Sequence, residues 1–146
     1  MNSKELRILQ ELRKNARRSL TEISYITDIP LSSVFKKVHK LEKGLIKRYI
    51  SFVDFASLGF SIRINLVLKS KEREPLRKFL LDHPNVNSLY RISQNFDFLV
   101  ETIFPNMLEF ENFLEEINDF VSEKKVFHIV EDFRREDFML EDEQVK

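Results

Sequence analysis

Hydrophobic residues at the start of the chain recur with the period of an α-helix. Between residues 3 and 15, and again between 20 and 26, they lie three or four positions apart, so two amphipathic helices are predicted. Ser19 and Glu22 stand at the start of the second with the spacing of a capping box. Asp28 tolerates a left-handed conformation and Pro30 disfavours helical geometry at the residue before it, so the chain is expected to turn there.

A third helix is predicted after this turn. Its apolar residues, spaced by four and three positions, form one inward stripe of Val34, Val38 and Leu41. The opposite side is almost wholly cationic and carries Ser32, Ser33, Lys36, Lys40 and Lys43, with Lys37 on its flank. Gly44 is expected to cap this helix, and the β-branched and aromatic residues between 45 and 53 predict a strand.

From residue 61 the pattern changes to the alternation of a half-buried strand, with apolar residues at every second position up to 68. A helix with Pro75 in its first turn follows, and then two strands at 86–92 and 96–104 joined by a hairpin. A phenylalanine-rich helix at 107–121, whose stripe we assign to the core, precedes a strand at 126–133. The order βαββαβ is that of a ferredoxin-like split βαβ sandwich.

The charge is distributed unevenly although the whole chain is neutral. Residues 1–60 contain twelve Lys/Arg and six Asp/Glu, a net charge of +6, whereas residues 61–146 contain twelve and eighteen, a net charge of −6. A basic half joined to an acidic half indicates a polyanion-binding module attached to a module that stays off the polyanion.

Several classes of site have no support in the sequence. The chain contains no cysteine, which excludes disulfides, thiolate zinc sites and a cysteine nucleophile, and its three histidines stand in separate segments. No apolar run reaches the ~18 residues of a membrane helix, and no signal peptide is recognised, so we expect a cytoplasmic protein without membrane contact. No nucleophile, base and orienting group fall at catalytic spacing. We expect no enzyme activity, no metal and no cofactor.

Two short helices, a tight turn and a lysine-faced helix form the pattern of a helix-turn-helix, whose recognition helix enters the major groove of double-stranded DNA. The candidates for reading bases are Ser32, Ser33, Lys36 and Lys37. Phosphate contacts, which position the protein without specifying sequence, are expected from Arg17, Arg18, Lys40, Lys43, Lys47 and Arg48. The competing interpretation is a solvated lysine face on an ordinary helix.

The order and spacing of several motifs resemble the Lrp/AsnC (feast/famine) family of transcriptional regulators over nearly the whole chain. The similar segments are ELRIL at 5–9, NARRS at 15–19, VHKLEKGLIKRY at 38–49, SQNFDFLVET at 93–102 and PNM at 105–107. Together with the patterns above, the resemblance implies an α+β chain. We expect a winged-helix-like helix-turn-helix domain at 1–50, a strand and linker at 51–60, a ferredoxin-like RAM domain at 61–135 and an acidic tail at 136–146.

The resemblance further implies homodimers, assembling into tetramers or octamers, that form through the RAM sheets and the strand near residues 46–53. It implies that an amino acid or related metabolite binds at a loop corresponding to Ser93, Gln94, Asn95 and Asp97. Gln94 replaces a family glycine that leaves room for a ligand, and the turn at 28–30 lacks the family's glycine and serine. Asp97, flanked by two phenylalanines, either caps the hairpin or contacts the effector.

We therefore predict a sequence-specific DNA-binding transcriptional regulator that acts as a dimer or higher oligomer and is modulated by a small metabolite. One alternative is a sequence-independent architectural protein whose lysines contact phosphates alone. The other is a metabolite-binding or enzymatic RAM-type protein with a vestigial helix-turn-helix.

Overall fold

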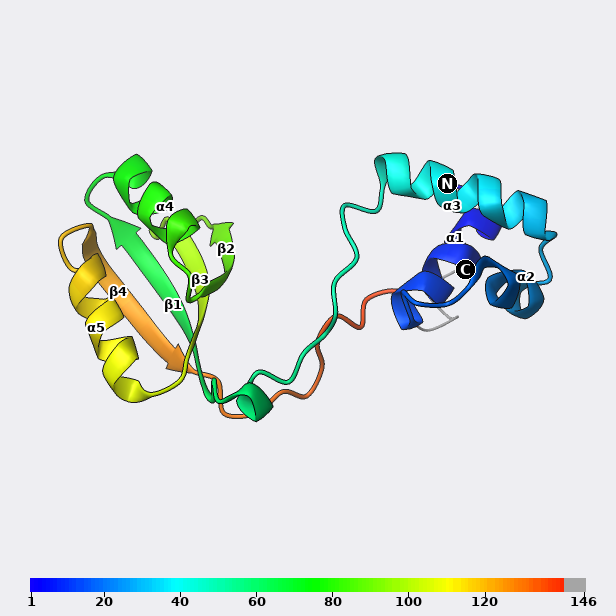
Figure 1. The fold of residues 1–146 in the computed structure, drawn as a ribbon. Coiled ribbons are helices and arrows are strands. Elements are labelled where there is room, and N and C mark those ends of the chain that lie inside the picture. Colours follow the sequence, from blue (N-terminus) through cyan, green and yellow to red (C-terminus); the bar gives the residue numbers. More distant parts are fainter. Residues whose placement is uncertain (141–146) are drawn as a thin grey trace. The chain divides into compact units, whose positions relative to one another are not determined.

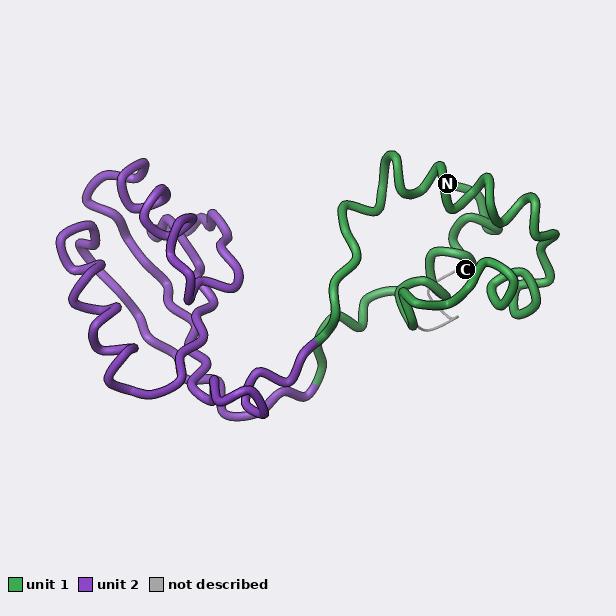
Figure 2. Tube along the Cα trace, in the orientation of Figure 1, with its two compact units in different colours: residues 1–52, 134–146 green, residues 53–133 purple. Residues whose placement is uncertain are grey.

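The computed structural model describes residues 1–140, which divide into two compact units (Figures 1 and 2). The first unit contains residues 1–52 together with the C-terminal segment that begins at Arg134, and the second contains residues 53–133. Residues 134–140, the described part of the C-terminal segment, form neither helix nor strand. The rest of the predicted acidic tail, residues 141–146, lies outside the described residues.

Residues 1–52 form three α-helices, α1 (Ser3–Lys14), α2 (Leu20–Thr27) and α3 (Leu31–Gly44). Helices α1 and α3 each contribute an apolar stripe to a shared core, to which α2 adds Ile23, while Ile26 of α2 is exposed. The core consists of Ile8, Leu12, Ile23, Ile29, Val34, Val38 and Leu41. The capping box of α2 is confirmed, because the Glu22 amide donates to Ser19 Oγ (3.1 Å) and the Ser19 amide donates to Glu22 Oε2 (2.7 Å). The apolar stripe of α3 faces inward, as its helical spacing predicted.

The turn between α2 and α3 depends on the residues that the sequence singled out. Asp28 adopts a left-handed conformation (φ 52°), which a short polar side chain tolerates better than most. Ile29 is buried in the core, and its carbonyl accepts a hydrogen bond from Ser24 Oγ (2.6 Å). Pro30 then starts α3 without a side-chain cap. A buried side chain and a serine of α2 therefore set the direction of α3, in place of a glycine turn.

Two predictions for the end of α3 are wrong. Gly44 is the last residue of the helix and not a left-handed cap, and the chain leaves through Leu45, whose backbone stays right-handed. Residues 45–53 do not form a strand. They have the composition of one, but a strand also needs a neighbour to complete its backbone hydrogen bonds, and no strand pairs with them within residues 1–140.

Residues 53–133 form a βαββαβ unit on a four-stranded antiparallel sheet (Figure 1). A 3-10 turn at Ala56–Leu58 precedes β1 (Ile62–Ser70), α4 (Arg73–Asp82), β2 (Val86–Arg91), β3 (Phe98–Phe104), α5 (Met107–Ile117) and β4 (Val121–His128). The strand order is β2-β3-β1-β4. The predicted ferredoxin-like arrangement is confirmed.

Alternation along the strands gives this sheet two unlike faces. One face packs against α4 and α5 and holds the core, which includes Leu66, Leu68, Leu76, Phe104 and Phe113. The phenylalanine stripe of α5 lies in this core, as predicted. The other face, which we call the helix-free face, carries Val67 opposite Leu99, together with exposed Tyr90 and Phe127.

The last strand begins earlier than predicted. The sequence indicated residues 126–133, whereas β4 spans Val121–His128. Residues 122–125 are polar and exposed, which conceals a strand from a hydrophobicity pattern. They are tolerated because β4 lies at an edge of the sheet, where charged side chains are common.

Candidate nucleic-acid interface

The outward side of α3 presents hydroxyl and ammonium groups to solvent. Ser32, Lys36 and Lys43 are exposed and Ser33 is half-buried, while Val34 and the rest of its stripe lie in the core. Within residues 1–140, Lys36 and Lys43 make no side-chain hydrogen bond or ion pair. Both ammonium groups are available to an anionic ligand.

A buried carboxylate of α1 holds the other two lysines of α3. Glu5 is 4% exposed, and its Oε1 accepts a hydrogen bond from Lys40 Nζ (2.9 Å) and lies 3.9 Å from Lys37 Nζ. The hydrogen bond from Lys40, followed by one from the Asn2 amide, lowers the pKa of Glu5, so this carboxylate is ionised at neutral pH. Lys37 and Lys40 are consequently drawn toward α1 and partly neutralised.

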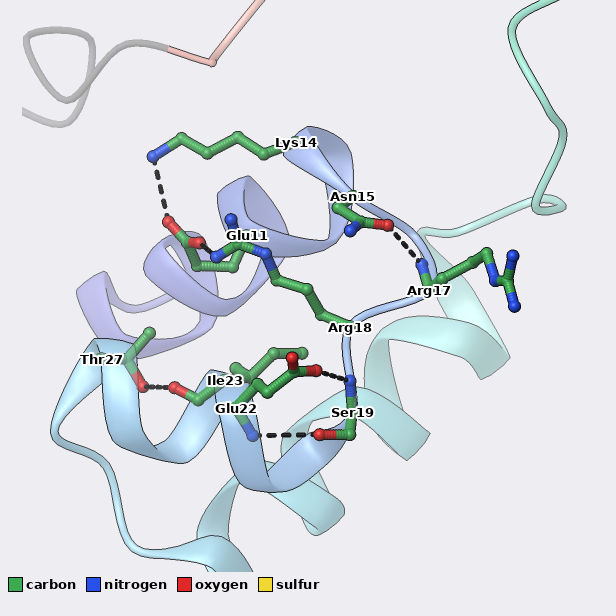
Figure 3. A network of polar contacts seen from close by, with 9 residues as sticks. All are labelled: Glu11, Lys14, Asn15, Arg17, Arg18, Ser19, Glu22, Ile23 and Thr27. Atoms are coloured by element: carbon green, nitrogen blue, oxygen red, sulfur yellow. Dashed lines mark hydrogen bonds and ion pairs between the residues drawn. The ribbon is translucent and has the colours of Figure 1, made fainter.

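Arg17 and Arg18 are adjacent in sequence but point in different directions (Figure 3). Arg18 is paired with the buried carboxylate of Glu11, which also accepts a hydrogen bond from Lys14 Nζ (3.0 Å). The Arg17 amide donates to Asn15 Oδ1 (3.0 Å), while its guanidinium extends away from this network. Of the two arginines, Arg17 is the better placed to contact a ligand.

Lys47 and Arg48 lie on the exposed segment that follows α3. Lys47 Nζ donates to the Gly44 carbonyl at the end of the helix (3.3 Å). Tyr49 OH donates to Glu42 Oε1 (3.0 Å), and partial burial, followed by this hydrogen bond, raises the pKa of Tyr49 to about 12. The neutral phenol thus joins the segment that carries both cations to α3.

Two aromatic residues on the exposed side of α3 were missed by the sequence analysis. Phe35 is 60% exposed, and its ring stacks on His39 with centroids 6.4 Å apart and planes 9° apart. The outer face, which was predicted to be almost wholly cationic, therefore also includes an aromatic part. The available signal was the spacing of these two rings, four positions apart and outside the buried stripe.

The loop predicted to bind an effector is the hairpin between β2 and β3. Ser93, Gln94 and Asn95 are exposed, and the last two adopt left-handed conformations (φ 69° and 73°). Lys69 Nζ donates a hydrogen bond to Asn95 Oδ1 (3.1 Å), which ties the loop to β1.

Asp97 lies at the base of this loop and contacts the start of α4. The amide and hydroxyl of Ser70 donate to Asp97 Oδ2 (2.8 and 2.6 Å), and Arg73 lies 3.4 Å from Oδ1. The hydrogen bonds from Ser70, reinforced by the charge of Arg73, lower the pKa of Asp97. The carboxylate therefore fixes the connection between β1 and α4.

Comparison with known proteins identifies the family. The model of the Lrp/AsnC ligand binding domain matches residues 60–129. An HTH-type transcriptional regulator of Pyrococcus furiosus is 30% identical over 138 residues, which cover 87% of this chain and 89% of the relative. The chain belongs to the Lrp/AsnC family. It is accordingly a DNA-binding transcriptional regulator and not an enzyme, as the sequence analysis predicted.

Solved structures of this family share the fold. Bacillus subtilis LrpC has a TM-score of 0.87 at 23% identity, covering 92% of this chain and 97% of LrpC. The complex of the Neisseria meningitidis regulator NMB0573 with L-Met has a TM-score of 0.83 at 18% identity, covering 92% and 93%. Within residues 1–140 of the present chain, no helix is long and apolar enough to cross a lipid bilayer.

Proposed function

We propose that α2, the turn at Asp28 and α3 form a helix-turn-helix within residues 1–50, and that α3 enters the major groove of double-stranded DNA in the cytoplasm and reads its sequence. Ser32 and Lys36 contact base edges, with Ser33 and Lys37 at the margin of the contact. Phosphates are bound by Arg17, Lys43, Lys47 and Arg48, while Arg18 and Lys40 add attraction at longer range.

The observation that carries this proposal is that, within residues 1–140, two lysines of α3 are paired with an acid and two are not. Glu5 pairs with Lys37 and Lys40, whereas Lys36 and Lys43 point outward without a partner in residues 1–140. Two unpaired ammonium groups contribute no ion pair to the stability of the helix. DNA supplies the acceptors that they lack, as phosphate oxygens and as guanine O6 and N7.

We propose dimerisation through the helix-free face of the domain at 61–135 and through residues 45–53. Val67, Leu99 and Phe127 present apolar surface on that face, which a second copy would remove from water. The segment 45–53 would gain the strand neighbour that it lacks among the described residues of one chain. Further association of dimers would give the tetramers or octamers that the family resemblance implies.

An amino acid or related metabolite is proposed to act at Ser93, Gln94, Asn95 and Asp97, and the L-Met complex of the Neisseria relative supports this class of ligand. Gln94 holds a φ of 69°, which glycine adopts freely, so its side chain occupies space where the family has none. We expect Gln94→Gly to bind L-methionine about tenfold more tightly than the wild type in calorimetry. Tight binding of L-methionine by the wild type would contradict this obstruction.

Competition binding at physiological salt tests the proposed function. A palindromic duplex obtained by selection from random DNA should be preferred over random DNA by much more than about tenfold. A preference below that value would overturn sequence-specific recognition and favour the architectural alternative, in which the same lysines contact phosphates alone.

A further inference from the structure

Exposed residues on α3 form two parallel rows with four-residue spacing. One row is apolar and aromatic and consists of Leu31, Phe35 and His39; the other is polar and consists of Ser32, Lys36 and Lys40. In the first row, Leu31 is 47% exposed and Phe35 is 60% exposed. The helix thus offers an apolar strip directly beside its hydrogen-bonding groups.

The Phe35 ring is oriented by its own helix and not by the core. It stacks nearly parallel on the His39 ring, one helical turn further along α3. A single exposed apolar residue is ordinary on a protein surface. Here Phe35 shares a row with exposed Leu31, and the next row carries Lys36, whose ammonium group has no partner within residues 1–140, so apolar and polar recognition groups share one side of the helix.

We propose that Phe35, supported by His39 and Leu31, contacts the 5-methyl group of a thymine and is a specificity-determining residue. This inference rests on the proposed insertion of α3 into the major groove. The thymine methyl is the apolar group that base pairs display in that groove, and phenylalanine is among the side chains suited to it. Lys36, one position along the helix, reaches the edge of a neighbouring guanine. The preferred half-site therefore contains a thymine that is recognised through its methyl group.

Replacement of thymidine by deoxyuridine provides the test, because it removes the 5-methyl group and keeps every hydrogen-bonding group of the base. The full chain is titrated with the duplex selected from random DNA and with versions in which each thymine is replaced in turn. We expect one thymine in each half-site whose replacement weakens wild-type binding about fourfold, the effect of one buried methyl group. Phe35→Ala should bind both duplexes equally, and Phe35→Leu should retain part of the discrimination.

The matched control is Leu81→Ala, because Leu81 is a comparably exposed apolar residue (57%) on α4 and should leave the discrimination unchanged. Equal wild-type affinity for all thymine and deoxyuridine duplexes would overturn the inference, as would undiminished discrimination by Phe35→Ala. Either result would leave sequence-specific binding intact. Failure to select any preferred sequence would instead overturn the proposed function and this inference together.

Discussion

Lys36 and Lys47 carry the same charge in different surroundings. Lys36 is exposed on the outward face of α3, where its ammonium group can follow the helix into a groove. Lys47 lies beyond the helix, with its Nζ 3.3 Å from the Gly44 carbonyl. Under the proposed insertion of α3 into the major groove, Lys36 reaches a base edge, whereas Lys47 approaches the sugar-phosphate backbone. Substitution of Lys36 should therefore alter sequence preference, whereas substitution of Lys47 should alter the affinity for all DNA sequences.

Lys36→Ala should relax the sequence preference, costing about 1–3 kcal/mol on the preferred duplex and less on random DNA, because a base contact is lost. Lys47→Ala should weaken binding to both duplexes equally and reduce the slope of log K against log salt by about 1, because one phosphate contact is lost. Fluorescence titrations of both duplexes over a range of salt concentrations measure these effects. Equal loss of specificity in the two variants would show that the assignment of base and phosphate contacts is wrong.

Elements defined by neighbouring residues were predictable, and contacts between distant residues were not. The capping box of α2 and the left-handed turn at Asp28 depend on residues at most a few positions apart, and the sequence predicted both. Lys40 is paired with an acid 35 positions away, so its partial neutralisation could not be read from the chain. The strand expected at 45–53 failed for a related reason, since β pairing requires a neighbour that sequence composition does not supply.

The connection from β1 to α4 should respond to pH through Asp97. Its pKa is lowered below the usual 3.8 by hydrogen bonds from Ser70, so its contribution to stability is present above that pH and is lost as the pH falls through the lower, folded-state value. Asp97→Asn should lower the free energy of unfolding by about 1–3 kcal/mol at pH 7, and the difference should shrink below pH 3.8. Urea unfolding at fixed protein concentration measures this.

Asp119→Asn, which removes an exposed carboxylate beyond the end of α5, is the control for Asp97→Asn. It should change the unfolding free energy by less than about 0.5 kcal/mol at pH 7. A difference between wild type and Asp97→Asn that stayed constant from pH 7 to pH 3 would contradict the role assigned to the ionised carboxylate.

Along the chain, the net positive charge lies in residues 1–60, whereas the apolar helix-free face lies in residues 61–146. The basic half contains α3 and its outward lysines, and the acidic half contains the sheet with its helix-free face. If the acidic half assembles copies, its negative charge keeps that face away from DNA phosphates. The basic parts of two copies are then held together, and each needs to supply only part of the affinity for DNA. Binding should therefore depend on the geometry of two half-sites.

Insertion of about 5 base pairs between the half-sites of the selected duplex should weaken binding strongly, because it places the second major groove on the opposite side of the DNA. Insertion of about 10 base pairs should restore part of the affinity, since successive grooves on one side lie about 34 Å apart. Leu99→Asp, which places a charge opposite Val67 on the helix-free face, should yield monomers in sedimentation equilibrium whose weak binding is insensitive to spacing. Equal sensitivity of this monomeric variant would contradict paired insertion of two α3 helices.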